Sequence, residues 1–212
     1  MLIKFKDIVR KYGITPNGIL HVGAHHAEEA LSYTESGVHN VLWVEADIET
    51  FKELSVIINK YPLHKPYCFA ASDVDGQEVD FHVASNGESS SILEMGKHTI
   101  HHPHITVVDK KIVKTKKIDT FFEEEDFSPY DYNFLNLDIQ GAELLALKGM
   151  KNSLEKINYI YTEVNSAEVY KKCAQIEELD EYLSEFGFKR VETKMTPYEW
   201  GDALYIKEKI TL

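Results

Sequence analysis

Acidic side chains stand at the ends of four apolar segments of this chain. They are Glu45, Asp73, Asp138 and Glu163. In an open α/β sheet the ligand binds outside the carboxyl ends of the parallel strands, because those ends share one edge. We therefore expect a cleft lined with carboxylates. Such groups accept hydrogen bonds from sugar hydroxyls, and they remove the proton of an alcohol in general base catalysis.

The turn after the first apolar segment restricts the kind of cofactor. A dinucleotide fold has Gly-x-Gly-x-x-Gly here, so that backbone amides reach a pyrophosphate. Counted from Gly23, the next two glycine positions hold His25 and Glu28, and Glu29 follows. The two acids would put negative charge at a helix N-terminus, where a phosphate would otherwise bind. The sequence therefore argues against NAD and FAD.

A cofactor with a ribose, an ammonium and a sulfonium but no phosphate fits this turn better. Gly23 lets an adenosine approach the backbone closely. Glu45 follows Gly23 by about 20 residues, the spacing of an acid that binds ribose hydroxyls. The alternative is an α/β protein that binds no nucleotide, in which Gly23 is only a turn residue and Glu45 only a surface acid.

The segments that must position these residues alternate between strand and helix patterns, which predicts an α/β sheet with parallel strands. Strands are expected at 19–22, 40–44, 66–71, 132–137 and 157–162, and helices at 27–36, 48–60, 141–150 and 176–186. Segments 188–192 and 203–206 are expected to close the sheet as an antiparallel pair. The rhythm breaks at 77–117, where alternating segments flank a loop at 86–103 rich in Ser, Gly and His. We expect a single domain over 1–212, with a helical lead-in at 1–18 and a hairpin and loop insertion at 77–117 that shapes the acceptor site.

Composition excludes several partners. The net charge is -12, and the one basic run, Lys110 to Lys117, alternates with Ile112 and Val113 like the solvent face of a strand, so nucleic acid is not an expected partner. No segment has the run of about 18 apolar residues that spans a bilayer, and 1–12 lacks the uncharged core of a signal peptide. Two unrelated cysteines form no disulfide framework. We expect a cytoplasmic protein without a membrane partner, and we leave open a homo-oligomer.

Several sequence blocks resemble those of a known family and occur in the same order along the chain. They are residues 19–25, 44–46, 71–76, 89–91, 136–143 with 147–149, and 161–165. Together they resemble the FkbM family of class I S-adenosylmethionine (SAM)-dependent methyltransferases, over about 19–206. The most specific block is Asn136-Leu137-Asp138-Ile139-Gln140-Gly141-Ala142-Glu143, since the family has a near-identical Asp-x-x-Gly-Ala-Glu segment after its fourth strand.

The resemblance implies a fold and an activity. The fold is Rossmann-like, with a seven-stranded, mostly parallel sheet, an antiparallel closing strand and helices on both faces. The activity is SAM-dependent methyl transfer, with O-methylation of a hydroxyl on a sugar, glycan or small metabolite as the leading reading. Other readings are an amine or nucleotide acceptor, and an inactive SAM-binding scaffold that works through partners.

The same resemblance assigns residues to the site. Cofactor contacts are expected from His21, Gly23, Ala24, His25, Glu45, Ala46, Ser72, Asp73 and Asp138. Substrate contacts are expected from Ser89, Ser90, Ser91, His101 and His102. Asp138 is the expected base, with Glu163 beside it to orient the hydroxyl or assist; the alternative for Asp138 is a cap of the helix at 141–150. No metal site is predicted, although Asp138 and Glu163 are left open as ligands of a divalent ion.

Three positions depart from the family pattern. Many relatives have an acid where His21 stands, which favours the scaffold reading. Many have a glycine where Ala27 stands, and we expect Ala27 in the first turn of a helix. Gln140 replaces the usual glutamate and keeps its size without its charge.

Overall fold

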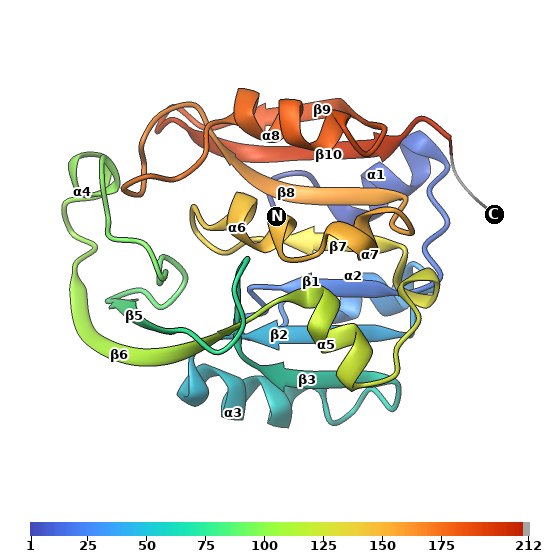
Figure 1. Cartoon of the computed structure of the whole chain (residues 1–212), viewed down its shortest axis with the longest axis horizontal. Coiled ribbons are helices and arrows are strands. Elements are labelled where there is room, and N and C mark those ends of the chain that lie inside the picture. Colours follow the sequence, from blue (N-terminus) through green and yellow to red (C-terminus); the bar gives the residue numbers. More distant parts are fainter. Residues whose placement is uncertain (210–212) are drawn as a thin grey trace.

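A seven-stranded sheet forms the centre of the computed structural model, which describes residues 1–209 (Figure 1). Its order is β3-β2-β1-β7-β8-β10-β9. The strands are β1 (Ile19–Val22), β2 (Val41–Glu45), β3 (His64–Cys68), β7 (Phe134–Leu137), β8 (Tyr159–Asn165), β9 (Phe188–Met195) and β10 (Trp200–Lys207). The first five run parallel to one another, whereas β10 is antiparallel to both β8 and β9. The predicted fold class, including the antiparallel closing strand, is confirmed.

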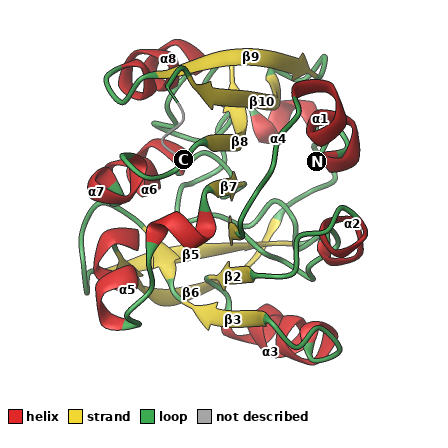
Figure 2. Cartoon of the chain, turned by 90° about the vertical axis from the view of Figure 1, so that its right-hand side faces the viewer, coloured by secondary structure: helices red, strands yellow, loops and turns green. Residues whose placement is uncertain are grey.

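Helices cover both faces of this sheet (Figure 2). On one face lie α1 (Phe5–Tyr12), α2 (Ala30–Glu35) and α3 (Ile48–Ile58), and on the other α5 (Ile118–Glu124), α6 (Glu143–Lys148), α7 (Lys151–Leu154) and α8 (Ile176–Ser184). Side chains of a strand point alternately to the two faces, so Leu20 and Val22 join one core and Ile19 the other. Every residue of β1, β2, β7 and β8 is buried, which holds their carboxyl ends in fixed positions.

The segment 70–116 forms a second, three-stranded sheet, of order β4-β6-β5. Its strands are β4 (Ala70–Ala71), β5 (Glu78–Ala84) and β6 (Val107–Lys116), and the loop between β5 and β6 contains α4 (His98–His101). The single strand expected at 66–71 is wrong, because the chain leaves the central sheet after β3 and β4 pairs with Thr115 and Lys116 instead. The alternating segments expected on either side of the loop at 86–103 are β5 and β6.

Two helix starts also differ from the prediction. The helix expected from residue 27 begins at Ala30, because His25 and Ala27 have left-handed backbone angles, with φ of 42° and 55°. Ala27 is therefore not in a first helical turn. The helix expected from residue 141 begins at Glu143, since Gln140 and Gly141 also have positive φ. A short 3₁₀ helix (Pro129–Tyr132) precedes β7. Within residues 1–209, none of the helices has the length and apolar character to cross a membrane.

Candidate active-site cleft

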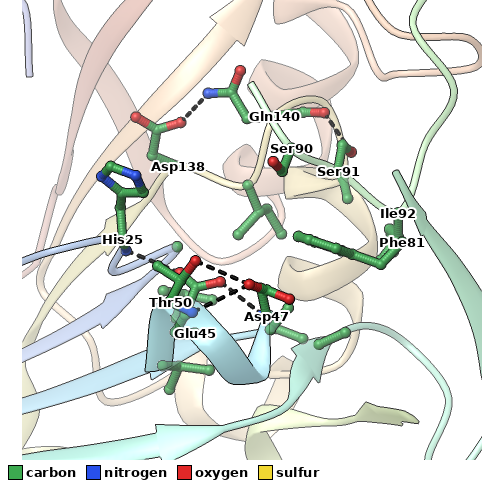
Figure 3. A pocket seen from close by; sticks show the side chains of 18 of the residues that line it. His25, Glu45, Asp47, Thr50, Phe81, Ser90, Ser91, Ile92, Asp138 and Gln140 are labelled. Carbon is green, nitrogen blue, oxygen red and sulfur yellow. Dashed lines mark hydrogen bonds between the residues drawn. The ribbon is translucent and has the colours of Figure 1, made fainter. Parts of the chain in front are cut away.

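Two adjoining cavities open at the carboxyl edge of the central sheet. We call the first the apolar cavity; its walls include Val22, Val44, Phe69, Ala71, Phe81, Val83 and Ile92, with Glu45 and Asp47 on one side (Figure 3). We call the second the acidic cavity; it is lined by Glu28, Glu29, Glu88, Asp138, Glu163 and Asp202, together with His98, His102, Tyr170 and Trp200. The acidic cavity has a volume of about 480 Å³, in the range of small-molecule sites. Gly23, His25, Glu88, Asp138 and Gln140 line both cavities, so the two meet there.

Glu45 ends β2 and is held on the floor of the apolar cavity. Its two oxygens accept the backbone N–H groups of His25 and Asp47, each at 2.9 Å. Burial raises the pKa of this carboxyl, and the two hydrogen bonds oppose that rise. A carboxylate oxygen has two lone pairs, so each oxygen retains the capacity to accept one more hydrogen bond. Two adjacent hydroxyls, as in a ribose, match this capacity.

Gly23 is required by the contact between two strand ends. Its φ is 85°, and a Cβ added to it would lie 1.7 Å from the carbonyl oxygen of Asp138. The Asp138 N–H in turn donates to the Val22 carbonyl at 3.0 Å. The turn after β1 and the turn after β7 therefore touch, and any side chain at position 23 would separate them.

Gln140 joins the two carboxylates that were expected at the chemistry. Its amide nitrogen donates to Asp138 Oδ1 at 2.6 Å and to Glu163 Oε2 at 2.8 Å. Its amide oxygen accepts the Tyr170 hydroxyl at 2.6 Å. Ser91 Oγ donates to the Gln140 carbonyl at 2.8 Å, which ties the insertion to this turn (Figure 3). The Gln140 amide thus bridges Asp138 and Glu163.

The two carboxyls differ in how readily they lose a proton. Burial, and next the negative charge of Asp202, raise the pKa of Asp138 to about 6, and the hydrogen bond from Gln140 opposes the rise. Glu163 is only 4% exposed. Burial and the neighbouring Asp138 raise its pKa well above the ordinary value. Burial and neighbouring charge therefore disfavour the ionised form of Glu163 more strongly than that of Asp138. Acid pairs with separated pKa values are typical of catalytic sites.

Glu143, the acid of the Gly-Ala-Glu segment, has a structural role. Its buried carboxyl accepts the backbone N–H groups of Ile139 at 3.0 Å and Gly141 at 3.1 Å, and so fixes the turn after β7. A Cβ on Gly141 would lie 2.8 Å from Tyr170 Cβ. The N-cap residue of α6 is Ala142, and no side chain caps this helix. The alternative role of Asp138 as a helix cap is therefore wrong.

His21, expected at the cofactor, lies mostly inside the core and borders the acidic cavity. Only 3% of it is exposed, its Nδ1 lies 3.0 Å from the Tyr33 hydroxyl, and its ring stacks on Trp43 at 4.7 Å. Burial lowers its pKa to about 4, so the ring is neutral. His21 reaches the floor of the acidic cavity, but its hydrogen bonds are made inside the core. The ring is part of a buried polar cluster with Tyr33 and Asn136.

The other expected site residues divide between the cavities. Ala46, Ser90 and Ser91 line the apolar cavity, and Ala24, Ser89 and His102 line the acidic cavity. Ser72 and Asp73, which directly follow β4, lie outside the lining of both. His101 also lies outside, with its Nε2 2.9 Å from Glu199.

Sequence reasoning missed Asp202, Tyr170 and Glu29. Asp202 accepts hydrogen bonds from the Tyr161 hydroxyl and the Leu2 N–H. It is the register partner of Glu163 across the antiparallel β8–β10 pair. An antiparallel closing strand must begin at the edge where its neighbour ends, so the position of Asp202 was available from the predicted topology. Tyr170 and Glu29 had no such signal.

The possible metal ligands are found elsewhere than expected. Ligand atoms of His25, His26 and Glu28 lie within 4.8 Å of one another, at the mouth of the cleft. His25 Nδ1 is 2.7 Å from Glu28 Oε1, and this hydrogen bond raises the pKa of His25. His25 and Glu28 therefore already pair with each other, and His26 lies next to this pair.

The strand order places the cleft between β1 and β7, where the order along the sheet reverses and open α/β folds bind their ligands. Fold and cleft together define a class I, Rossmann-like α/β protein. The chain belongs to the methyltransferase FkbM domain family, which matches residues 21–190. It is 31% identical to the 2-O-methyltransferase NoeI of Sinorhizobium fredii over 123 residues, which cover 53% of this chain and 49% of NoeI. The similarity thus spans about half the length of that relative.

Solved structures agree with this fold. The Streptococcus pneumoniae protein Sp1610, in complex with SAM, has a TM-score of 0.55 at 12% identity, covering 100% of this chain and 76% of Sp1610. The magnesium protoporphyrin IX methyltransferase of Synechocystis PCC 6803, with bound SAM, has a TM-score of 0.50 at 7% identity, covering 90% of this chain and 69% of that enzyme. At these identities the similarity establishes the architecture.

Proposed function

We propose that this chain is a SAM-dependent O-methyltransferase acting on a hydroxyl of a sugar or another small hydroxylated molecule. The observation that carries the proposal is the Asp138–Gln140–Glu163 arrangement at the junction of the two cavities. One carboxyl, with its pKa raised to about 6, lies beside a second whose pKa is raised well above its ordinary value. This combination suits the removal of a proton from an alcohol.

The residues of the apolar cavity fit the adenosine part of SAM. The walls of Val22, Val44 and Phe81 would bury an adenine ring, and the free lone pairs of Glu45 would accept the ribose hydroxyls. The junction at Gly23 and Asp138 would hold the methionyl part. SAM would supply there a methyl group for direct displacement by an oxygen nucleophile. The carboxylates of the acidic cavity would stabilise the positively charged cofactor by electrostatic attraction.

The chain's own residues then have distinct tasks. Asp138 accepts the proton of the acceptor hydroxyl, a role that typically contributes about 10²–10⁴-fold. Glu163 is buried and its raised pKa favours the protonated form, which would donate a hydrogen bond that orients the acceptor. Gln140 holds both carboxyls, and Tyr170 in turn holds the Gln140 amide. Because proximity is the larger part of such catalysis, this rigid chain of hydrogen bonds positions the base.

The O-methyl assignment draws on the 2-O-methyltransferase NoeI as a relative, over about half of its length. An amine or nucleotide acceptor remains the second reading. An inactive SAM-binding scaffold is the third reading, since the His21 ring makes its hydrogen bonds inside the core and does not replace the acid that many relatives have at this position. No step assigned here depends on a metal.

The test is Asp138→Asn, a nearly isosteric change that removes the base and leaves the hydrogen bond from Gln140 able to form. SAM affinity, measured by calorimetry, should stay within about threefold, whereas release of S-adenosylhomocysteine with a panel of sugars should fall by about 10²-fold or more. Asp131→Asn, the same change on an exposed residue before β7, is the control and should alter neither. Full turnover in Asp138→Asn would remove Asp138 as the base. Loss of wild-type activity with a chelator, restored by a divalent ion, would replace the base with a metal ligand.

A further inference from the structure

Two histidines and a glutamate lie together in the turn between β1 and α2. Nδ1 of His25 is 2.7 Å from Glu28 Oε1, and Nδ1 of His26 is 3.9 Å from the same oxygen. Ligand atoms of all three side chains lie within 4.8 Å of one another. Two imidazoles and one carboxylate are typical ligands of zinc and other divalent transition metals, whereas Mg²⁺ and Ca²⁺ prefer oxygen atoms. The set of donors therefore indicates an ion of the zinc type.

The distances between these side chains are close to those around a bound ion. In a tetrahedral site with metal–ligand distances of about 2.0–2.2 Å, neighbouring ligand atoms are about 3.3–3.6 Å apart. The two distances to Glu28 Oε1, 2.7 Å from His25 and 3.9 Å from His26, lie on either side of this range. An ion would replace the hydrogen bond between His25 and Glu28. All three side chains are partly exposed, so water can reach the ion and complete its coordination.

The surroundings of His26 provide a second and independent indication. Its Nε2 lies 2.9 Å from Oε2 of Glu53 on α3, while its Nδ1 is on the side of Glu28. A histidine that binds a metal through one ring nitrogen usually donates the other N–H to a carboxylate, which fixes the tautomer and orients the ring. Glu53 is placed to do this for His26. It comes from a different element, so α3 and the turn would build the site together.

The backbone of the turn has a costly conformation that fits a ligand site. His25 and Ala27 have φ of 42° and 55°, although neither residue is a glycine. The ring centroids of the adjacent His25 and His26 are 4.0 Å apart. Neighbouring residues of a regular helix or strand point in different directions, so this irregular turn is what allows both rings to approach one carboxylate. Such strained residues are concentrated at active sites and ligand clamps.

We propose that His25, His26 and Glu28 bind a divalent transition-metal ion of the zinc type, with Glu53 orienting His26 and water completing the coordination. The ion would hold the turn after β1 in place. Because the His25 N–H donates to Glu45, it would also fix one of the two backbone donors that position this carboxyl. The ion would coordinate neither of the carboxyls proposed for catalysis, so the site does not depend on the proposed methyl transfer.

The experiment titrates the full chain with zinc chloride by calorimetry, after a chelator has removed metal and has itself been dialysed away. We expect one ion to bind per chain, and Mg²⁺ not to bind at this site. His26→Ala and Glu28→Gln each remove a ligand and should weaken zinc binding by about 10²-fold or more, whereas Glu53→Gln should weaken it by about tenfold. Zinc should also raise the melting temperature of the wild type, since an ion that binds only the native state stabilises it.

His104→Ala is the matched control, because His104 is an exposed histidine of the insertion and lies outside this turn. It should leave the affinity for zinc unchanged. No binding of zinc by the wild type, or wild-type affinity in the folded His26→Ala and Glu28→Gln variants, overturns the proposal. Loss of zinc binding in His104→Ala would locate the ion in the histidine-rich loop and would overturn it as well. Circular dichroism confirms that each variant is folded.

Discussion

The two cavities of the cleft share one edge of the sheet but differ in what their walls can do. The apolar cavity is built from strand ends and from Phe69, Phe81 and Ile92, and its carboxylate at Glu45 is already fixed by two backbone N–H groups. The acidic cavity brings together carboxyls whose pKa values are raised by burial and by one another. Under the proposed function, the first cavity would provide affinity for SAM, and the second would provide proton transfer and acceptor choice. Variants in the two cavities should therefore change different constants.

Apart from Asp138 variants, a substitution of Gln140 should have the largest effect that distinguishes the roles of the two cavities. In Gln140→Glu a third carboxyl replaces the amide that donates to Asp138 and Glu163. The lost hydrogen bond and the added charge both raise the pKa of Asp138 further, so less of the base is ionised at pH 7. Turnover should fall by about 10²-fold while SAM affinity changes little. Calorimetry and a turnover assay on the same preparation measure both.

The control is Glu94→Gln. Glu94 is an exposed acid of the insertion and pairs with Lys171, so this variant removes a charge and leaves Gln140 in place. It should leave turnover unchanged. If Gln140→Glu kept wild-type turnover, the amide would not position the base, and the division between the two cavities would lose its main support.

The next effect is expected in the apolar cavity. Glu45→Ala removes the acceptor proposed for both ribose hydroxyls, and should weaken SAM binding by about 1.5–3 kcal/mol, the range for hydrogen bonds to a charged group. Turnover at saturating SAM should stay within a few-fold of wild type. Glu49→Ala, on the exposed surface of α3, controls for loss of a nearby acid. Unchanged SAM affinity in a folded Glu45→Ala variant would show that the cavity binds something else.

The pH dependence of turnover tests the role of Asp138 in the acidic cavity without altering the shape of that cavity. Because the pKa of Asp138 is raised to about 6, and the base acts as its carboxylate, turnover should be level above about pH 7 and fall about tenfold per pH unit well below 6. Asp202→Asn removes the neighbouring charge that contributes to this rise, so the midpoint should move to lower pH. A midpoint that stayed in place, or moved upward, would contradict the assigned cause.

The smallest effect concerns the turn that lies between the cavities. Ala27 has a φ of 55°, which costs an L-residue about 1–2 kcal/mol, whereas glycine adopts this angle freely but loses more conformational entropy on folding. Ala27→Gly should therefore raise the free energy of unfolding by about 0.5–1 kcal/mol. Thermal unfolding measures this change in free energy. Ala30→Gly, in α2, is the control and should destabilise the protein. A lower melting temperature for Ala27→Gly would mean that the turn is not strained.

How far the sequence predicted the site depended on which strand preceded each acid. Glu45, Asp138 and Glu163 follow or end strands of the central sheet, so the shared edge could be inferred from their apolar runs alone. Asp73 follows an equally apolar run, yet the chain changes sheets between Cys68 and Ala70. The run at 66–71 contains no polar residue or glycine that would mark where the chain leaves the first sheet.

The missed features arise from contacts between distant segments. The buried location of the His21 ring depends on Tyr33 and Trp43, which β1 meets only after folding. Tyr170 reaches Gln140 from a loop after β8. Positive φ at Ala27 and Gln140 was also hidden, since neither residue is a glycine and local propensity favours a helix for both. Sequence periodicity therefore specified the scaffold and three of its acids, and tertiary contacts determined what surrounds them.

The antiparallel closing strand has a consequence for how the protein is made. Asp202 joins Glu163 only when β10 inserts between β8 and β9, and β10 is the last strand of the described chain. The apolar cavity draws on residues 22–142, all of which leave the ribosome before β10. Long-range pairings form late, because the intervening chain must be ordered first. During synthesis the cofactor side of the cleft should thus be assembled before the acceptor side, and a nascent chain halted before β10 should lack the pocket that selects the substrate.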